Sequence, residues 1–82
     1  MNKKLKDHVY HTLLEEVCDI VFIKKDGDKR SMKCTLIKDM VPETSYAESR
    51  DDHSQVVYDI EKSEWRSFRW DSLKEFNGMH IE

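Results

Sequence analysis

The sequence is poor in glycine, cysteine and long apolar runs. Gly27 and Gly78 are its only glycines, so it has no glycine-rich loop that could cradle a phosphate. Two cysteines, Cys18 and Cys34, are too few for a secreted disulfide framework, and we expect reduced, buried thiols in a cytoplasmic protein. No run approaches the roughly 20 apolar residues that span a bilayer, so no membrane segment is expected.

The chain is also short and polar. Its 82 residues are 38% apolar and 38% charged, which predicts a single domain, 1–82, with a small core. A deep, water-excluding active site is hard to house in such a domain. Carboxylate pairs such as Asp51-Asp52 fall in expected loops without the apolar surroundings that raise a pKa. We therefore expect a protein that is not an enzyme and that carries no cofactor.

The N-terminal segment has the pattern of an amphipathic helix over about residues 4–16. Apolar residues recur every four positions, at Leu5, Val9, Leu13 and Val17. His8, His11 and Glu15, at i, i+3 and i+7, share one face of this helix. They have no cysteine or histidine partners at a fixed spacing elsewhere, so we interpret them as a polar helix face and not as a metal site.

Residues 18–37 predict a β-hairpin that turns at Gly27. A turn with Gly27 in a G1 bulge places six residues on one face: Cys18, Ile20, Phe22, Met32, Cys34 and Leu36. A two-residue Asp26-Gly27 turn would shift the register by one and split this set. We favour the bulge because it buries more apolar surface, and it makes the two cysteines cross-strand neighbours.

Residues 39–53 hold the only proline and few apolar side chains, which predicts a long exposed loop. Met40, Val41 and Tyr46 are its candidates to pack back onto the sheet.

A second hairpin is expected over about residues 55–70. A two-residue turn at Lys62-Ser63 would place Asp59 opposite Arg66 and Val57 opposite Phe68. A 3₁₀ turn and a last short strand would follow over residues 71–81. The order predicts a mainly β, α+β fold: an N-terminal helix and a small SH3/Sm-like barrel of four or five antiparallel strands. The alternative is an open antiparallel sheet with the helix across one face.

Several segments together resemble a known family: Phe22-Ile23-Lys24-Lys25-Asp26-Gly27, Arg30 to Leu36, Val57 to Lys62, Trp65-Arg66-Ser67-Phe68-Arg69 and Asp71-Ser72-Leu73. These segments are similar to a family of small, mostly uncharacterised proteins of tailed bacteriophages, and the resemblance covers about residues 17–73. It implies an Sm-like or SH3-like barrel, distantly related to the WYL domain, and a phage setting. WYL domains proper bind nucleotides or nucleic acid, but their Trp-Tyr-Leu signature does not occur here. No ligand residues can therefore be carried over.

Aromatic residues and arginines alternate in the segment 65–70. In a strand, Trp65, Ser67 and Arg69 share one face, and the intervening residues Arg66, Phe68 and Trp70 share the other. Exposed aromatics beside arginine make a stacking platform for unpaired bases. The simpler interpretation, which we favour, has Phe68 and Trp70 in the core, Arg66 paired with Asp59, and Trp65 as the exposed member.

Positive charge is concentrated in residues 20–38, with a net charge of +4, whereas residues 40–82 have a net charge of −5. The candidate nucleic-acid-binding residues near the first hairpin tip are Lys24, Lys25, Lys29, Arg30 and Lys33. The sequence pI of about 5.8 lies far from the basic range of dedicated nucleic-acid binders. We therefore interpret this group first as a solvated hairpin tip.

The composition and the resemblance lead us to expect a non-enzymatic interaction module that binds and modulates a host or phage protein. The long loop and the strand edges offer surfaces for such a partner. The candidate contact residues are Tyr46, Arg50, Trp65, Arg66 and Arg69. The alternative is a regulatory protein that binds single-stranded nucleic acid or a nucleotide, and a homo-oligomer through strand edges is also open.

Overall fold

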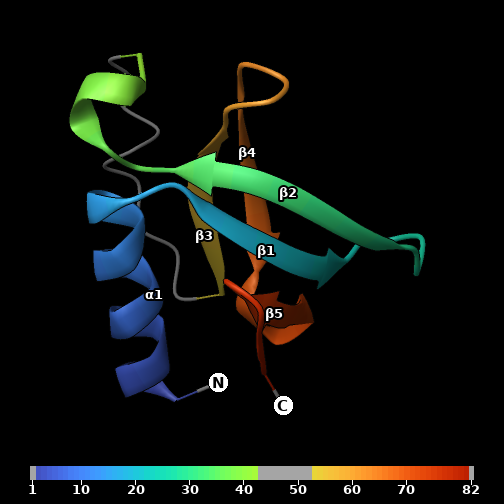
Figure 1. Cartoon of the computed structure of the whole chain (residues 1–82). Coiled ribbons are helices and arrows are strands. Elements are labelled where there is room, and N and C mark those ends of the chain that lie inside the picture. The colour runs from blue at the N-terminus through green and yellow to red at the C-terminus, as the bar shows by residue number, and fades with distance from the viewer. Residues whose placement is uncertain (1, 43–52, 82) are drawn as a thin grey trace.

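The computed structural model describes residues 2–42 and 53–81, which form one helix and six strands. Their order is α1 (Lys3–Glu15), β1 (Cys18–Ile23), β2 (Lys29–Thr35), β3 (Ser54–Asp59), β4 (Glu64–Arg69), β5 (Leu73–Phe76) and β6 (Met79–His80). Two single 3₁₀ turns, η1 (Lys38–Met40) and η3 (Trp70–Ser72), interrupt the strands. The strands form an antiparallel sheet in the order β4-β3-β2-β1-β5-β6. The β1–β2 ribbon crosses in front of β3 and β4, with α1 beside it (Figure 1).

A helix followed by an antiparallel sheet confirms the expected mainly β, α+β fold. The number of strands differs from the four or five predicted, because the C-terminal segment forms a hairpin and not a single strand. β5 turns at Asn77 and Gly78, which both have positive φ angles, and returns as β6. The 3₁₀ turn expected near residue 71 is present and begins one residue earlier, at Trp70.

Helix α1 begins at an Asn2 N-cap, whose Oδ1 accepts the N–H of Leu5 at 2.8 Å. Its apolar stripe packs on the sheet: Val9 and Leu13 are fully buried, and Leu5 and Tyr10 pack against the core. The strands contribute most of that core, through Cys18, Ile20, Met32, Cys34, Val57, Phe68, Leu73 and Phe76. Leu36, Trp70 and Ile81, which each directly follow a strand, complete it. The helix thus closes one side of a core that is built mainly from strands.

The first hairpin has the bulged register that the sequence favours. Cys18 lies opposite Cys34 and Ile20 opposite Met32. The N–H of Lys24 donates to the carbonyl of Asp28, and the N–H of Gly27 donates to that of Lys24. With Gly27 at φ +92°, this is a type I turn followed by a G1 bulge.

The register predicted for the second hairpin is wrong by two residues. Asp59 lies opposite Glu64 and Val57 opposite Arg66, so the loop holds four residues, 60–63, and not two. The carboxylate of Asp59 explains the longer loop, because its Oδ1 accepts the N–H groups of Glu61 and Lys62 at 3.0 Å each. A shift of two residues leaves every side chain on its expected face.

The start of the expected loop 39–53 also differs from the prediction. Met40 does not pack back onto the sheet, since it lies in η1 and is 48% exposed. Leu36 fills the adjoining part of the core instead, and its N–H donates to the carbonyl of Leu13 at 2.9 Å. Val41 is half-buried. Tyr46 lies outside the described residues.

Candidate functional site

An aromatic pair marks the outward face of β3 and β4. Tyr58 and Trp65 are cross-strand partners, and their rings meet edge to face with centroids 5.3 Å apart. Both side chains are half-buried, and Trp65 packs against the core, so the expectation that Trp65 is exposed is wrong. Ser67 and Arg69 follow Trp65 on the same face and are exposed. We call Tyr58, Trp65, Ser67 and Arg69 the β3–β4 outer face.

The opposite face of β4 belongs to the core. Phe68 and Trp70 are buried, as the simpler interpretation of the segment expects, and their rings are 5.3 Å apart. Arg66 lies at the margin of this face, where its Nε is 3.4 Å from Oδ2 of Asp59 and its Nη2 contacts Glu64. Asp59 is 2% exposed. The guanidinium of Arg66 is thus engaged by two carboxylates within the protein.

The other candidate contact residues are distributed unevenly. Arg69 is exposed at the end of β4 and pairs with Asp71 at 3.2 Å. The hydrogen bond from Arg69 is the main cause that lowers the pKa of Asp71 below its ordinary value. Tyr46 and Arg50 lie outside the described residues. Among the candidates, the structure therefore brings Trp65 and Arg69 together on one face and places Arg66 on the other.

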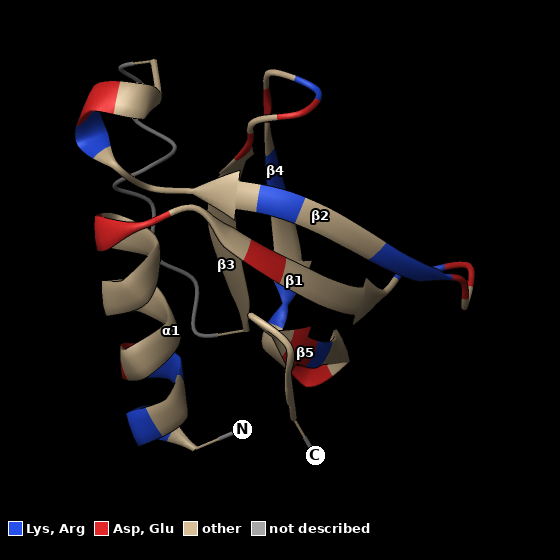
Figure 2. Ribbon diagram, viewed as in Figure 1, with Lys and Arg blue, Asp and Glu red and all other residues tan. Residues whose placement is uncertain are grey.

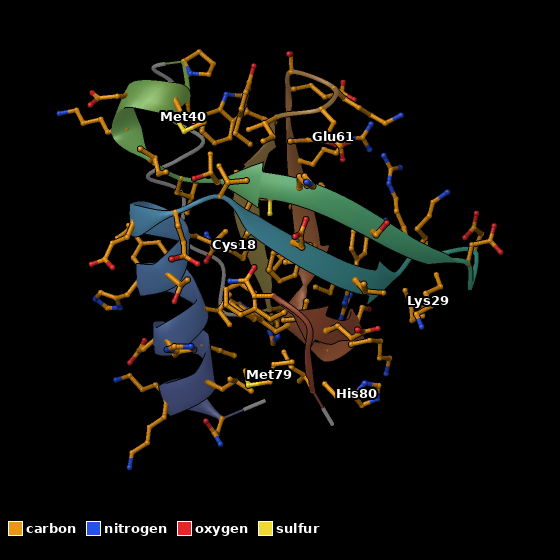
Figure 3. All side chains as sticks on the ribbon, in the orientation of Figure 1. Cys18, Lys29, Met40, Glu61, Met79 and His80 are labelled. Atoms are coloured by element: carbon orange, nitrogen blue, oxygen red, sulfur yellow. The ribbon has the colours of Figure 1, made fainter. Side chains whose placement is uncertain are left out.

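The basic residues of the first hairpin do not form a patch of one sign. Lys24 pairs with Asp26 at 3.5 Å, and Lys29 pairs with Glu75 of β5 at 3.8 Å. Figure 2 shows blue and red segments in alternation at this tip, and Figure 3 labels Lys29 there.

The remaining members of this group lie on different faces of the hairpin. Lys33 lies opposite Asp19 in the register. Arg30 is half-buried and lies opposite Phe22, on the side of β2 that carries Met32. Lys25 is exposed in the turn. The structure therefore distributes these cations among acidic neighbours and over two faces.

The two cysteines are cross-strand neighbours, as the bulged register predicts. Both are fully buried free thiols. Burial raises the pKa of Cys34 to about 12, and it is also the main cause that raises the pKa of Cys18. Protonated thiols in an apolar setting pack as small hydrophobic groups and are poor nucleophiles.

The histidines of α1 have local partners. Nδ1 of His11 is 2.8 Å from the carbonyl oxygen of Asp7, and the ring of His8 meets Phe76 edge-on with centroids 6.2 Å apart. Within residues 2–42 and 53–81, no group of three or more His, Cys, Asp or Glu side chains is placed to hold a metal ion. No helix in this part of the chain is long and apolar enough to cross a membrane.

The sequence analysis did not predict the exposure of three apolar side chains, and for Met40 it predicted the opposite. Leu14 is 42% exposed near the end of α1, Met40 is 48% exposed in η1, and Met79 is 46% exposed in β6. Figure 3 shows Met40 and Met79 at opposite ends of the molecule. Leu14 lies just outside the set of apolar residues that recur every four positions in the helix. This position was the signal in the sequence that could have predicted its exposure.

Comparisons with known proteins agree with this architecture. Residues 3–74 match the family described as WYL_2, Sm-like SH3 beta-barrel fold. An uncharacterised 11.5 kDa protein of Enterobacteria phage T4, from the Gp31–cd intergenic region, is 38% identical over 74 residues, covering 80% of this chain and 71% of the relative. No solved structure matches significantly. The chain therefore belongs to the WYL_2 family of small phage proteins with an Sm-like SH3 β-barrel fold.

Proposed function

We propose that this chain is a non-enzymatic module that binds and modulates a host or phage protein in the host cytoplasm. The Tyr58–Trp65 pair carries the proposal, because its two rings are held edge to face and each leaves a part exposed to solvent on the face of the sheet opposite Phe68. Tyrosine and tryptophan are enriched at protein interfaces, where they supply large contact areas at little cost in conformational entropy.

The charges of the first hairpin favour a protein over nucleic acid. A nucleic-acid site needs cations that are available to phosphates. Lys24 and Lys29 are instead paired with Asp26 and Glu75, and Lys33 faces Asp19. The net charge of −3 acts in the same direction, because it repels a polyanion.

The second candidate function is binding of single-stranded nucleic acid or a nucleotide. One observation favours it: the β1–β2 hairpin extends beyond the rest of the sheet, so its tip is accessible (Figure 1). Lys25 and Arg30 would contact phosphates there, and Trp65 would stack a base. Association of copies through the edge strands β4 and β6 is a further arrangement, which the molar mass of the purified chain in solution would show.

The test is affinity capture from host lysate with the tagged chain, with and without nuclease. We expect to recover a stoichiometric protein whose binding survives nuclease and moderate salt. Trp65→Ala should weaken this binding at least about tenfold. Ser31→Ala, at an exposed position of β2 outside this face, is the control and should retain the partner. Recovery of nucleic acid alone, lost with Lys25→Glu and Arg30→Glu together, would establish the second function instead.

A further inference from the structure

The charges of helix α1 are arranged against its dipole. Its first turn has no acidic residue and contains Lys3 and Lys4, whereas its last turn has no basic residue and ends at Glu15. A helix carries partial positive charge at its N-terminus and partial negative charge at its C-terminus. Both ends of α1 are therefore destabilised by their own side chains, and the C-terminal end carries the two acids Glu15 and Glu16.

The C-terminal end of α1 carries an exposed apolar side chain, and η1, which follows nearby, carries another. Leu14 precedes Glu15 in the last turn and is 42% exposed. The hydrogen bond from Leu36 to the Leu13 carbonyl ties the chain just before η1 to this turn. η1 then presents Met40, which is 48% exposed. Figure 1 shows η1 next to the C-terminal end of α1.

The polar contacts at this end come mostly from neutral groups. The hydroxyl of Thr35 lies 3.2 Å from the carbonyl oxygen of Leu13 and 3.1 Å from that of Glu16. The side-chain amide of Asn77 donates to the Glu16 carboxylate at 3.3 Å. η1 adds Asp39 to the acids and Lys38 as its basic residue. Acidic segments mark both α1 and η1 here (Figure 2).

We propose that Leu14, Glu15, Asp39 and Met40, the α1–η1 end, form a docking surface for a basic, apolar segment of a partner protein. Leu14 and Met40 would contact an apolar side chain of that segment, and methionine adapts readily to different shapes. Glu15 and Asp39 would pair with its lysine or arginine, which would also relieve the uncompensated helix terminus. The same charges disfavour nucleic acid and anionic lipid. This surface is separate from the β3–β4 outer face and does not depend on Trp65.

The test uses a defined probe: a short, fluorescently labelled amphipathic peptide of leucine and lysine, and its counterpart with glutamate in place of lysine. We expect the lysine peptide to bind the full chain and the glutamate peptide not to bind. Glu15→Lys with Asp39→Lys should weaken binding at least about tenfold. Leu14→Ser should weaken it through lost apolar contact. The Glu15→Lys change should also raise the melting temperature, because it places a cation at the helix C-terminus.

A charge change at the other end of α1 is the matched control. Lys3→Glu with Lys4→Glu should also raise the melting temperature, for the same electrostatic reason, but should change peptide binding by no more than about twofold. Absence of lysine-peptide binding, or binding unaffected by the Glu15 and Asp39 changes, would overturn the proposal. Self-association of the wild-type chain that Glu15→Lys abolishes would also overturn it, because a second copy would then be the occupant.

Discussion

Arg66 and Asp59 pair diagonally across the β3–β4 hairpin: Nε of Arg66 is 3.4 Å from Oδ2 of Asp59, although their register partners are Val57 and Glu64. The register places the two carboxylates of Asp59 and Glu64 directly opposite each other, which is unfavourable for like charges. Arg66 contacts both of them and so offsets their repulsion. The pairing therefore stabilises the register that the loop imposes.

Removing this guanidinium should destabilise the fold. We expect Arg66→Ala to lower the free energy of unfolding by about 1–3 kcal/mol, since it leaves the buried Asp59 carboxylate without its cation. Urea unfolding followed by tryptophan fluorescence measures the change. Arg69→Ala is the matched control, because its ion pair with Asp71 is exposed and should contribute nothing measurable. Equal losses for the two variants would contradict this role of Arg66.

Asn77 connects the C-terminal hairpin to β1. Its Oδ1 accepts the N–H of Asp19 at 2.8 Å, and its own N–H donates to the Asp19 carbonyl at 2.7 Å. Asn77→Gly removes the side chain but tolerates the φ of 49°, so we expect a loss of about 1 kcal/mol. Asn77→Ala should lose about 2 kcal/mol, because it adds backbone strain. Thermal and urea unfolding would show this order, and the reverse order would contradict it.

Two turn positions should respond to substitution with opposite signs. Gly27→Ala should destabilise the protein by about 1 kcal/mol through its φ of +92° alone, since a Cβ there meets no heavy atom within 4 Å. Ser63→Gly should stabilise it by about 0.5 kcal/mol, because Ser63 has a φ of 54° that glycine adopts freely. Denaturant midpoints measure both changes. A stabilising Gly27→Ala would show that the bulge is not required.

The buried thiols should make stability depend on pH in the alkaline range. The pKa of Cys34 is raised from an ordinary 9.0 to about 12. Between these values the unfolded chain releases a proton that the folded chain retains, so this contribution is complete below about pH 9 and is lost as the pH rises toward 12. We expect the free energy of unfolding to fall more steeply between about pH 9 and about pH 11 in the wild type than in Cys34→Ala. Equal slopes under reducing conditions would contradict this.

The sequence was sufficient for the first hairpin and insufficient for the register of the second. In the first hairpin, Gly27 permits the bulge. The alternation of side chains between the two faces of a strand then decides which face holds Cys18 and Cys34. In the second, the deciding interaction is the hydrogen bonding of the Asp59 side chain to the backbone of its own loop. Such local side-chain bonds compete with strand pairing and leave no trace in the pattern of apolar residues.

The candidate surfaces also include features that the local sequence pattern predicts and features that it does not predict. Strand alternation was enough to place Trp65 and Arg69 on one face and Phe68 in the core. The exposure of Leu14 and Met40 depends on how η1 follows β2 beside the helix, which is a tertiary relationship. The two hydrogen bonds between Asn77 and Asp19 likewise join residues far apart in the chain. Periodicity does not report contacts of that kind.

The position of β1 between β2 and β5 has a consequence during synthesis of the protein. One edge of β1 pairs with β2, which follows it directly in the sequence. The other edge pairs with β5, which is translated much later, since Ile20 pairs with Phe76. Until then the nascent chain carries an incomplete sheet whose open edge can pair with other chains. Closure of this long-range contact should be the slow step of folding. Release of β5 from the ribosome is therefore the event that protects the molecule from aggregation.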